Sequence, residues 1–239
     1  FFFIIGSYIF YNTNILNEYH RPKYYEKRSA DYEKKYKKFK NIALPKITSV
    51  KGEVHLFPTD AKVEFSGTYK MKNKTGSSID TIHSNFSTRF PYSKYDWSIG
   101  NELVMRDSIF GWDMYVFDPP IMPGDEFLLQ FAGSQERQGF SNSGVNMTVV
   151  ENGTLIFSSQ IMPTFGYDPS RELSQKRTRK KYGLKEEQDP MPAYDDPEGL
   201  KNGILGDDAD WVDYEMIVST DPDQIAMTPG YLQNEWNEK

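Results

Sequence analysis

One stretch of this chain, residues 61–71, alternates apolar or small side chains with polar ones without a break. Every second position holds Ala61, Val63, Phe65, Gly67, Tyr69 or Met71. The residues between them are charged or carry a hydroxyl group. This period of two is typical of a β-strand with one buried face, because successive side chains of a strand point to opposite sides. Sheet formation is therefore the strongest constraint on the fold.

Shorter segments of the same kind lie on both sides of this run and are separated by turn residues. Strands are predicted at 50–56, 79–86, 101–106, 112–117, 125–131, 145–150 and 154–157. Aromatic residues make up 15% of the chain, so a hydrophobic content of only 38% still allows a real core. Short strands with frequent turns predict a mainly β fold of the β-sandwich type.

A last β unit is predicted at residues 210–232. Apolar side chains again occupy every second position from Val212 to Val218. Asp221-Pro222-Asp223 supplies a turn, and Ile225–Met227 is a predicted short return strand. We interpret this block as the boundary before a further domain.

Residues 1–16 are expected to be the end of a truncated transmembrane helix. The first ten residues are uncharged and almost wholly apolar, but a complete span needs about 20 apolar residues. Aromatic residues at the polar end of this run (Tyr8, Phe10 and Tyr11) suit a membrane interface. A buried strand or a hydrophobic N-terminal arm is the alternative.

Residues 17–44 are expected to form a basic helical stalk. Between Arg21 and Lys40 there are nine Lys or Arg and three Asp or Glu, a balance of +6 in a chain whose net charge is −6. Tyr25, Tyr32, Tyr36 and Phe39 recur at helical spacing within a helix predicted at 22–42. The stalk could touch anionic lipid headgroups, or its aromatic stripe could pack on the next domain. Its positive charge favours the cytoplasmic side of a membrane. The acidic remainder of the chain argues against general nucleic-acid binding.

Residues 45–239 are assigned to one β-sandwich domain with a helical and acidic-loop insertion at 168–209. The insertion contains a cluster of basic residues that could bind phosphate groups or pair with the acidic loop that follows. We favour pairing within the chain. The cluster consists of Arg171, Lys176, Arg177, Arg179, Lys180 and Lys181.

The sequence holds no recognisable catalytic constellation. There is no cysteine, and neither a zinc-helix motif nor a phosphate-binding loop occurs. The three histidines, His20, His55 and His83, stand apart in the sequence. No catalytic, cofactor-binding or metal-binding residue is therefore predicted. An acidic cluster lacks the spacing of a calcium loop and is interpreted as a solvated face; it comprises Asp207, Asp208, Asp210 and Asp213.

Three stretches resemble the N-terminal β domain of aminopeptidase N-like zinc peptidases, the gluzincin family. They are Val50–Asn73, which ends in Gly-Thr-Tyr-Lys-Met-Lys-Asn, Met122–Phe131, which begins Met-Pro-Gly-Asp, and the proline-centred Met162–Pro169. The resemblance implies a saddle-like β-sandwich. It also implies that the zinc ligands, the general-base glutamate and the substrate loop belong to a following domain, so zinc is expected there and not in this chain. Gln160 is too close to Pro163 to match the family's substrate-binding glutamine.

The sequence resembles one bacterial branch of this family more closely than the others. In that branch, such a peptidase region follows the membrane segments of an ABC-transporter-type permease. The matching stretches are Met162–Leu173, Arg179–Leu184 and Asp210–Leu232. This resemblance implies a protein anchored in the bacterial inner membrane. Its implied partners are the downstream peptidase domain, transporter subunits and a peptide substrate.

These observations predict a non-catalytic domain that packs on a zinc peptidase domain and shapes its cleft. One alternative is a membrane-stalked β-sandwich binding module that recognises a glycan or a protein through exposed aromatic side chains. Its candidate residues are Tyr92, Tyr95, Trp97 and Trp112. Another alternative is a transporter-associated domain whose peptidase region has lost its zinc motif.

Overall fold

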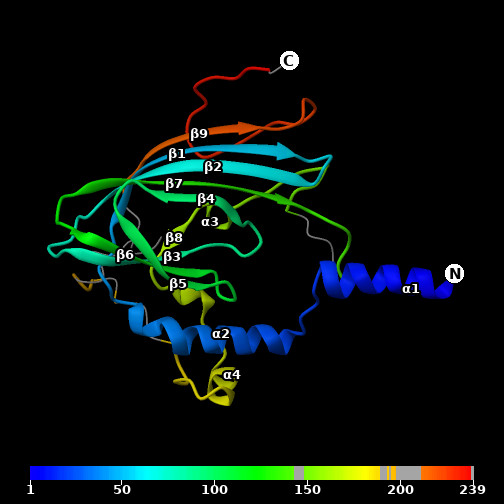
Figure 1. Cartoon of the computed structure of the whole chain (residues 1–239), viewed down its shortest axis with the longest axis horizontal. Helices are drawn as coiled ribbons and strands as arrows, with labels where there is room; N and C mark the ends of the chain where they lie inside the picture. The colour runs from blue at the N-terminus through cyan, green and yellow to red at the C-terminus, as the bar shows by residue number, and fades with distance from the viewer. Residues whose placement is uncertain (143–147, 189–192, 194, 198–210, 238–239) are drawn as a thin grey trace.

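Two β-sheets form the body of the molecule (Figure 1). The computed structural model describes residues 1–142, 148–188, 193, 195–197 and 211–237. In this part of the chain, the five-stranded sheet has the order β4 (Tyr92–Trp97), β7 (Glu126–Glu136), β2 (Lys62–Lys72), β1 (Lys46–Phe57) and β9 (Asp213–Ser219). The four-stranded sheet has the order β5 (Asn101–Asp107), β6 (Trp112–Ile121), β3 (Ile79–Asn85) and β8 (Thr164–Phe165). The mainly β fold expected from the alternation is confirmed.

Among the described strands, every pair runs antiparallel except β1 and β9. β1 and β2 form a hairpin in which Val50 lies opposite Tyr69. β9 runs parallel to β1, and its Tyr214 lies beside the same Val50. β9 is an outer strand of its sheet, so its far edge pairs with no other described strand. The strand predicted at Val212–Val218 is confirmed.

The core lies between the inner faces of the two sheets. Val63, Phe65, Tyr69 and Met71, four of the apolar residues in the alternating run, are buried there. They belong to one cluster with side chains of the other sheet, such as Phe117. Each large apolar side chain that leaves water stabilises the fold by roughly 1.5–3 kcal/mol before entropy is counted. The period of two thus determines which face of β2 is inside.

The segment before the sheets folds into helical elements: α1 (Phe2–Phe10), the π-helical η1 (Tyr11–Leu16), α2 (Pro22–Tyr36) and the 3-10 helix η2 (Lys37–Phe39). α2 runs below the four-stranded sheet in Figure 1. Tyr36 stacks on Trp112 with ring centroids 4.3 Å apart, and Tyr32 stacks on Tyr167 at 5.2 Å. Tyr32, Tyr36 and Phe39 of the aromatic stripe therefore pack on the β domain, one of the two arrangements that the sequence left open, whereas Tyr25 is 50% exposed.

α1 projects away from the sheets (Figure 1) and buries none of its side chains. It has nine residues, and no helix in the described part of the chain is long and apolar enough to cross a membrane. Beyond η1, the side-chain amide of Asn17 donates to the carbonyl groups of Gln138 and Phe140, at 3.0 and 3.3 Å. These two bonds tie the helical segment to the loop after β7.

Short helices occupy the region after β7: α3 (Ser158–Ile161), the 3-10 helix η3 (Pro169–Arg171) and α4 (Lys176–Lys181). The carboxylate of Asp168 accepts a hydrogen bond from the backbone N–H of Ser170 at 2.9 Å and so caps η3. Glu172 is extended, which separates η3 from α4 and lets its carboxylate lie 3.2 Å from Lys37 Nζ.

Some strand predictions are wrong. Residues 154–157 and 225–227 form no strand, and the described part of 145–150, residues 148–150, forms none either. In 225–227 the side chains of Ile225 and Met227 are exposed, so no sheet face buries them. A segment with a period of two forms a β-strand only where a neighbouring strand can form hydrogen bonds with it. β4 and β8 form without having been predicted.

Candidate functional site

The three histidines do not come together. His83 is buried, and its Nδ1 accepts a hydrogen bond from the indole N–H of Trp112 at 3.2 Å. Burial lowers the pKa of His83 to about 4, so its ring is neutral near pH 7. His55 contacts Ser219, and His20 stacks on Tyr24. In the described residues, no three histidine or acidic side chains converge to hold a metal ion.

The aromatic residues proposed for an exposed recognition surface lie mostly inside the molecule, and that prediction is wrong. Trp97 and Trp112 are buried. Tyr92 and Tyr95 are only partly accessible, and the Tyr92 hydroxyl donates to the carbonyl of Ile161 at 3.3 Å. The Tyr95 hydroxyl is hydrogen-bonded to Ser84. Trp97, Tyr92 and Tyr95 pack in the core between the sheets, which needs large apolar side chains. Trp112 packs instead against Tyr36 of α2.

The basic cluster pairs in two directions. Lys176 and Lys180 form ion pairs with Glu187 and Glu186, at the start of the predicted acidic loop. Lys181 pairs instead with Glu26 of α2, at 2.7 Å. Within the acidic cluster, Asp213 is exposed at the start of β9, whereas Asp207, Asp208 and Asp210 lie outside the described residues.

Arg179 joins α4 to α2 through a buried charge network. Its guanidinium is 2.8 Å from Glu33 and 3.5 Å from Glu172, and all three side chains are at most 4% exposed. Lys37 also contacts both carboxylates, at 3.0 and 3.2 Å. Burial would raise the pKa of Glu33, but hydrogen bonds from Arg179 and Lys37 lower it below the ordinary value. The network holds α4 against α2, because its buried charges neutralise one another.

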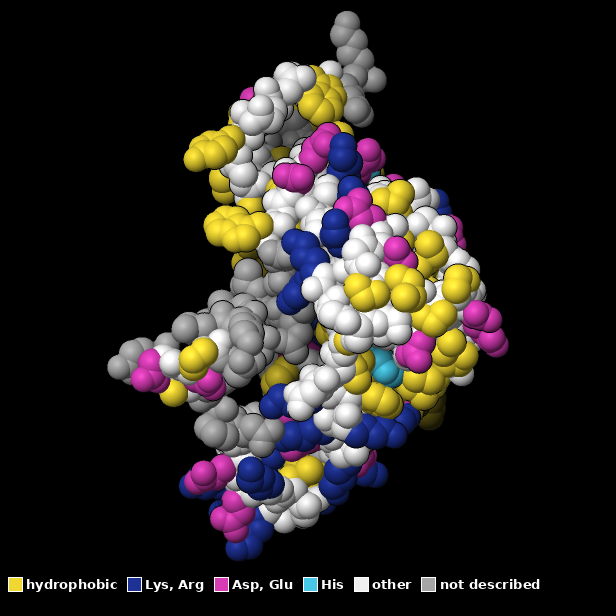
Figure 2. Space-filling model, turned by 90° about the vertical axis from the view of Figure 1, so that its left-hand side faces the viewer, with side chains coloured by type: hydrophobic (Ala, Val, Ile, Leu, Met, Phe, Trp, Pro, Cys, Tyr) yellow, Lys and Arg dark blue, Asp and Glu magenta, His cyan; other side chains and the backbone are white. Residues whose placement is uncertain are grey.

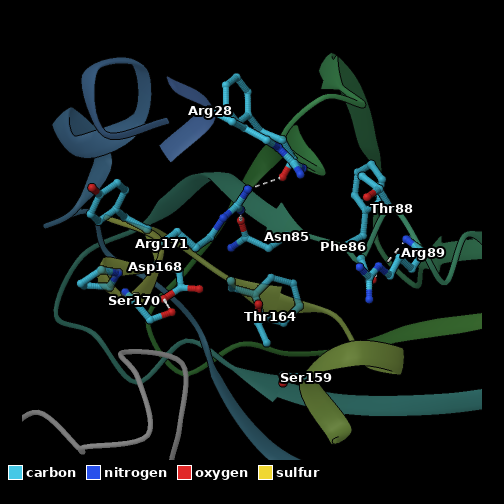
Figure 3. Close-up of a pocket in the computed structure, with 15 residues that line it drawn as sticks. Arg28, Asn85, Phe86, Thr88, Arg89, Ser159, Thr164, Asp168, Ser170 and Arg171 are labelled. Atoms are coloured by element: carbon cyan, nitrogen blue, oxygen red, sulfur yellow. Dashed lines mark hydrogen bonds between the residues drawn. The ribbon is translucent and has the colours of Figure 1, made fainter. Parts of the chain in front are cut away.

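A groove of about 540 Å³ beside β8 collects three arginines from separate parts of the chain (Figure 3). Arg28 comes from α2, Arg89 from the loop between β3 and β4, and Arg171 from η3. Thr164 lies on the groove wall, and Asp168 is its one carboxylate among the described lining residues. We call this feature the arginine groove.

Two of these arginines are held by main-chain carbonyl groups. Arg171 donates to the carbonyl of Phe110 at 2.7 Å and lies over the Tyr32 ring, 4.0 Å from its centroid. Arg28 donates to the carbonyl of Ile109. Sequence reasoning placed only Arg171 among possible anion ligands. The groove follows no motif, because its parts meet only through tertiary packing.

A second exposed feature is the apolar C-terminal segment, residues 211–237, in which several large side chains face solvent. Figure 1 shows the chain after β9 leaving the sheet, and Figure 2 shows hydrophobic side chains standing out near the top of the view. The exposed fractions are 94% for Trp211, 89% for Ile225, 88% for Met227, 93% for Tyr231 and 80% for Leu232.

On the face that Figure 2 shows, lysine and arginine side chains are densest away from the apolar C-terminal segment. In Figure 2 the lysine and arginine side chains gather at the height of α2 and α4, below the apolar C-terminal segment. Such a separation suits contacts of two kinds, one electrostatic and one hydrophobic.

Comparisons with known proteins give a limited likeness. No protein-family model matches the chain, and no curated protein matches it. Solved structures that resemble part of it include an M1 zinc metallopeptidase from Deinococcus radiodurans, at 10% identity and a TM-score of 0.31 over 39% of this chain. A mutant of that enzyme bound to a Tyr-Ser-Ala substrate matches the same share at 12% identity and a TM-score of 0.30. The chain spans 21% of the length of each.

Proposed function

We propose that this chain is the non-catalytic β domain of a membrane-anchored zinc metallopeptidase of the aminopeptidase N type. Its role is to pack on the zinc domain and to shape the substrate cleft. The sequence resemblance in Val50–Asn73, Met122–Phe131 and Met162–Pro169 suggests the family. The observation that carries the proposal is the apolar C-terminal segment, which needs a covering partner.

The size of this exposed surface is the physical reason. Single exposed apolar residues are ordinary on protein surfaces, whereas a group of them marks an interface. Five side chains of this segment are at least 80% exposed: Trp211, Ile225, Met227, Tyr231 and Leu232. Burying each against another domain contributes roughly 1.5–3 kcal/mol of transfer free energy. A peptidase domain beside β9 would supply that cover.

Zinc belongs to the partner domain in this proposal. The described residues of the chain contain no group that could hold a metal ion. In such peptidases zinc activates a water molecule for attack on a peptide bond. The β domain contributes shape and position only.

The membrane anchor is the second part of the proposal. α1 exposes Phe2, Phe3 and Ile4 by 75% or more, and Tyr8 and Tyr11 follow toward its polar end. We assign this segment to the bacterial inner membrane, next to the membrane part of an ABC-type permease. The basic residues of α2 favour the cytoplasmic side, because anionic headgroups attract them there.

The first test is catalytic. The purified chain should not hydrolyse aminoacyl p-nitroanilides, with or without added zinc. The coding sequence after Lys239 should encode HExxH and then a glutamate about 20 residues later. Zinc-dependent hydrolysis by the chain itself, or a stop codon after Lys239, would contradict the proposal. A degenerate motif would favour the transporter-associated alternative instead.

The second test is physical contact. Amide hydrogen exchange in residues 211–237 should slow when the zinc peptidase domain is joined or added. Leu232→Asp should weaken that protection, because a carboxylate would be buried in an apolar interface. Leu155→Asp is the matched control, since Leu155 is 69% exposed and lies outside this segment. Equal exchange with and without the peptidase domain would exclude the proposed contact.

The binding-module alternative retains one supporting observation, the arginine groove. It no longer has an exposed aromatic surface, because Trp97 and Trp112 are buried. Any ligand of the module would therefore meet cationic side chains.

A further inference from the structure

The arginine groove carries more positive charge than its lining residues neutralise. Arg28, Arg89 and Arg171 line it, and the only carboxylate among the described lining residues is Asp168, whose negative charge attracts Arg171. The carboxylate of Asp168 already accepts hydrogen bonds from the N–H and the hydroxyl of Ser170, at 2.9 and 2.6 Å. The described lining residues therefore carry three positive charges and one negative charge.

The hydrogen bonds that position the arginine side chains do not neutralise their positive charge. Arg28 and Arg171 donate to the carbonyl oxygens of Ile109 and Phe110, which are neutral acceptors. Asn85 Oδ1 is a further neutral acceptor, 3.5 Å from Arg171. The Nε atom of Arg28 is buried and has no hydrogen-bond partner. A buried donor without a partner costs roughly 1–3 kcal/mol, so an acceptor that reached this atom would stabilise the Arg28 side chain.

Electrostatics inside the groove agree with this geometry. The pKa of Arg171 is lowered from its ordinary value mainly by burial; Tyr32 and the carboxylate of Asp168 oppose this shift, and the charge of Arg28 adds to it. The guanidinium groups of Arg28 and Arg171 repel each other, so an anion between them would stabilise both. Figure 3 shows Arg171 extending from η3 toward the loop that Arg28 contacts, with Thr164 on the opposite wall.

We propose that the arginine groove binds an oxyanion, a phosphate or carboxylate group carried by a small molecule or a lipid headgroup. The planar guanidinium fork matches such groups with two parallel hydrogen bonds. Hydroxyl groups of Ser87, Ser159 and Thr164 surround the groove and provide further donors. This site is separate from the contact with a peptidase domain, and it does not depend on the proposed function.

The first experiment measures binding of inorganic phosphate and of succinate to the whole chain by isothermal titration calorimetry. Binding should saturate at low salt and weaken as sodium chloride rises, because the attraction is between charges. Arg89→Ala should weaken it by roughly tenfold, the loss expected for one charge-assisted hydrogen bond. Arg89 is exposed, so this variant should fold normally.

Lys94→Ala is the matched control. Lys94 is an exposed cation on β4 that contacts Gln130, and it does not line the groove. This variant should bind phosphate as the original chain does. An equal loss in Arg89→Ala and Lys94→Ala would indicate attraction to the general surface charge and would overturn the site.

A second experiment distinguishes the sources of the oxyanion. Vesicles of phosphatidylcholine, with and without phosphatidylglycerol, are titrated with the chain and with Arg89→Ala. If the variant loses only the preference for phosphatidylglycerol, and free phosphate and succinate do not bind, the ligand is a lipid headgroup. If neither the free ions nor the anionic vesicles distinguish Arg89→Ala from the original chain, the proposal is wrong.

Discussion

At the residue scale, the neighbours of a side chain decide whether it belongs to a core or to a surface. Only one physical requirement, an apolar face, acts on the inward-facing side chains of β2 between residues 61 and 71. Trp112 is a different case. Its type suits both a binding surface and a core, and the choice depends on α2, which covers it with Tyr36. The arginine groove needed the same tertiary information, since its residues share no motif.

The buried network around Arg179 gives the first prediction. Arg179→Ala removes one cation that Glu33 and Glu172 share, which leaves two buried carboxylates with Lys37 as their one remaining described cation. We expect a loss of about 3–5 kcal/mol in the free energy of unfolding, measured by urea titration. Lys176→Ala should cost far less, because its pair with Glu187 is exposed to solvent. Similar losses of unfolding free energy in both variants would show that Arg179 does not stabilise the contact between α4 and α2.

His83 gives a prediction about pH. Its folded pKa of about 4 lies below the ordinary 6.5, so the unfolded chain binds the proton more readily. Its contribution to stability is therefore full above pH 6.5 and falls as the pH drops toward 4, by about 3 kcal/mol in all. His83→Gln should show a flatter dependence of unfolding free energy on pH in that window.

The control for this pH effect is His20→Gln, which changes a ring that stacks on Tyr24 at the surface side of α2. This variant should keep the slope of the original chain between pH 6.5 and 4. If His83→Gln keeps that slope as well, the buried neutral imidazole is not its cause.

At the scale of elements, strand predictions succeed where the period is regular and fail where it is broken. β4 contains Tyr92, Tyr95 and Trp97, whose spacing changes from three to two. The register between β4 and β7 shifts between Tyr92 and Lys94, which is the irregularity that breaks the period. β8 has only two residues and can carry no period. Residues 154–157 show the opposite error, since their β-branched and aromatic side chains favour a strand and none forms.

The close approach of β4 and β7 gives a prediction at this scale. A Cβ atom on Gly133 would lie 2.4 Å from the carbonyl oxygen of Pro91 and 2.6 Å from the Phe65 ring. Gly133→Ala should therefore push the strands apart and cost about 1–3 kcal/mol or more in unfolding free energy. Gly76→Ala is the control, because a Cβ atom there meets nothing within 4 Å. Equal melting temperatures for the two variants would contradict this reading of the packing.

At the scale of the whole molecule, the two-sheet class follows from the sequence but the order of strands does not. Alternation of apolar and polar residues predicts which face of a strand is buried, but it does not predict which strand lies next to it in the sheet. β9 pairs with β1 across more than 150 residues of chain, as in the contact between Gly52 and Met216. The groove and the buried network likewise join segments that are distant in sequence. Such arrangements depend on the assembled shape.

The projecting helix gives a prediction for the complete chain. The chain should sediment with phospholipid vesicles, because α1 buries none of its side chains and exposes Phe2, Phe3 and Ile4 by 75% or more. Ile5→Asp should release it, since a carboxylate within an apolar membrane segment costs about 3 kcal/mol. Ile109→Asp, at a site 61% exposed on the β domain, should leave sedimentation unchanged. Sedimentation of Ile5→Asp at the original level would rule out α1 as the anchor.

The parallel pairing of β9 with β1 has a consequence for folding order. Contacts between segments far apart in sequence form slowly, because the intervening chain must first lose its freedom. We expect β9 to pair with β1 after the β1–β2 hairpin has formed, as the last step in folding of the sandwich. The apolar residues that follow β9 would then be positioned only on folded molecules, so only folded molecules would bind the peptidase domain. Pulse-labelled hydrogen exchange in which β9 gains protection before β1 would refute this order.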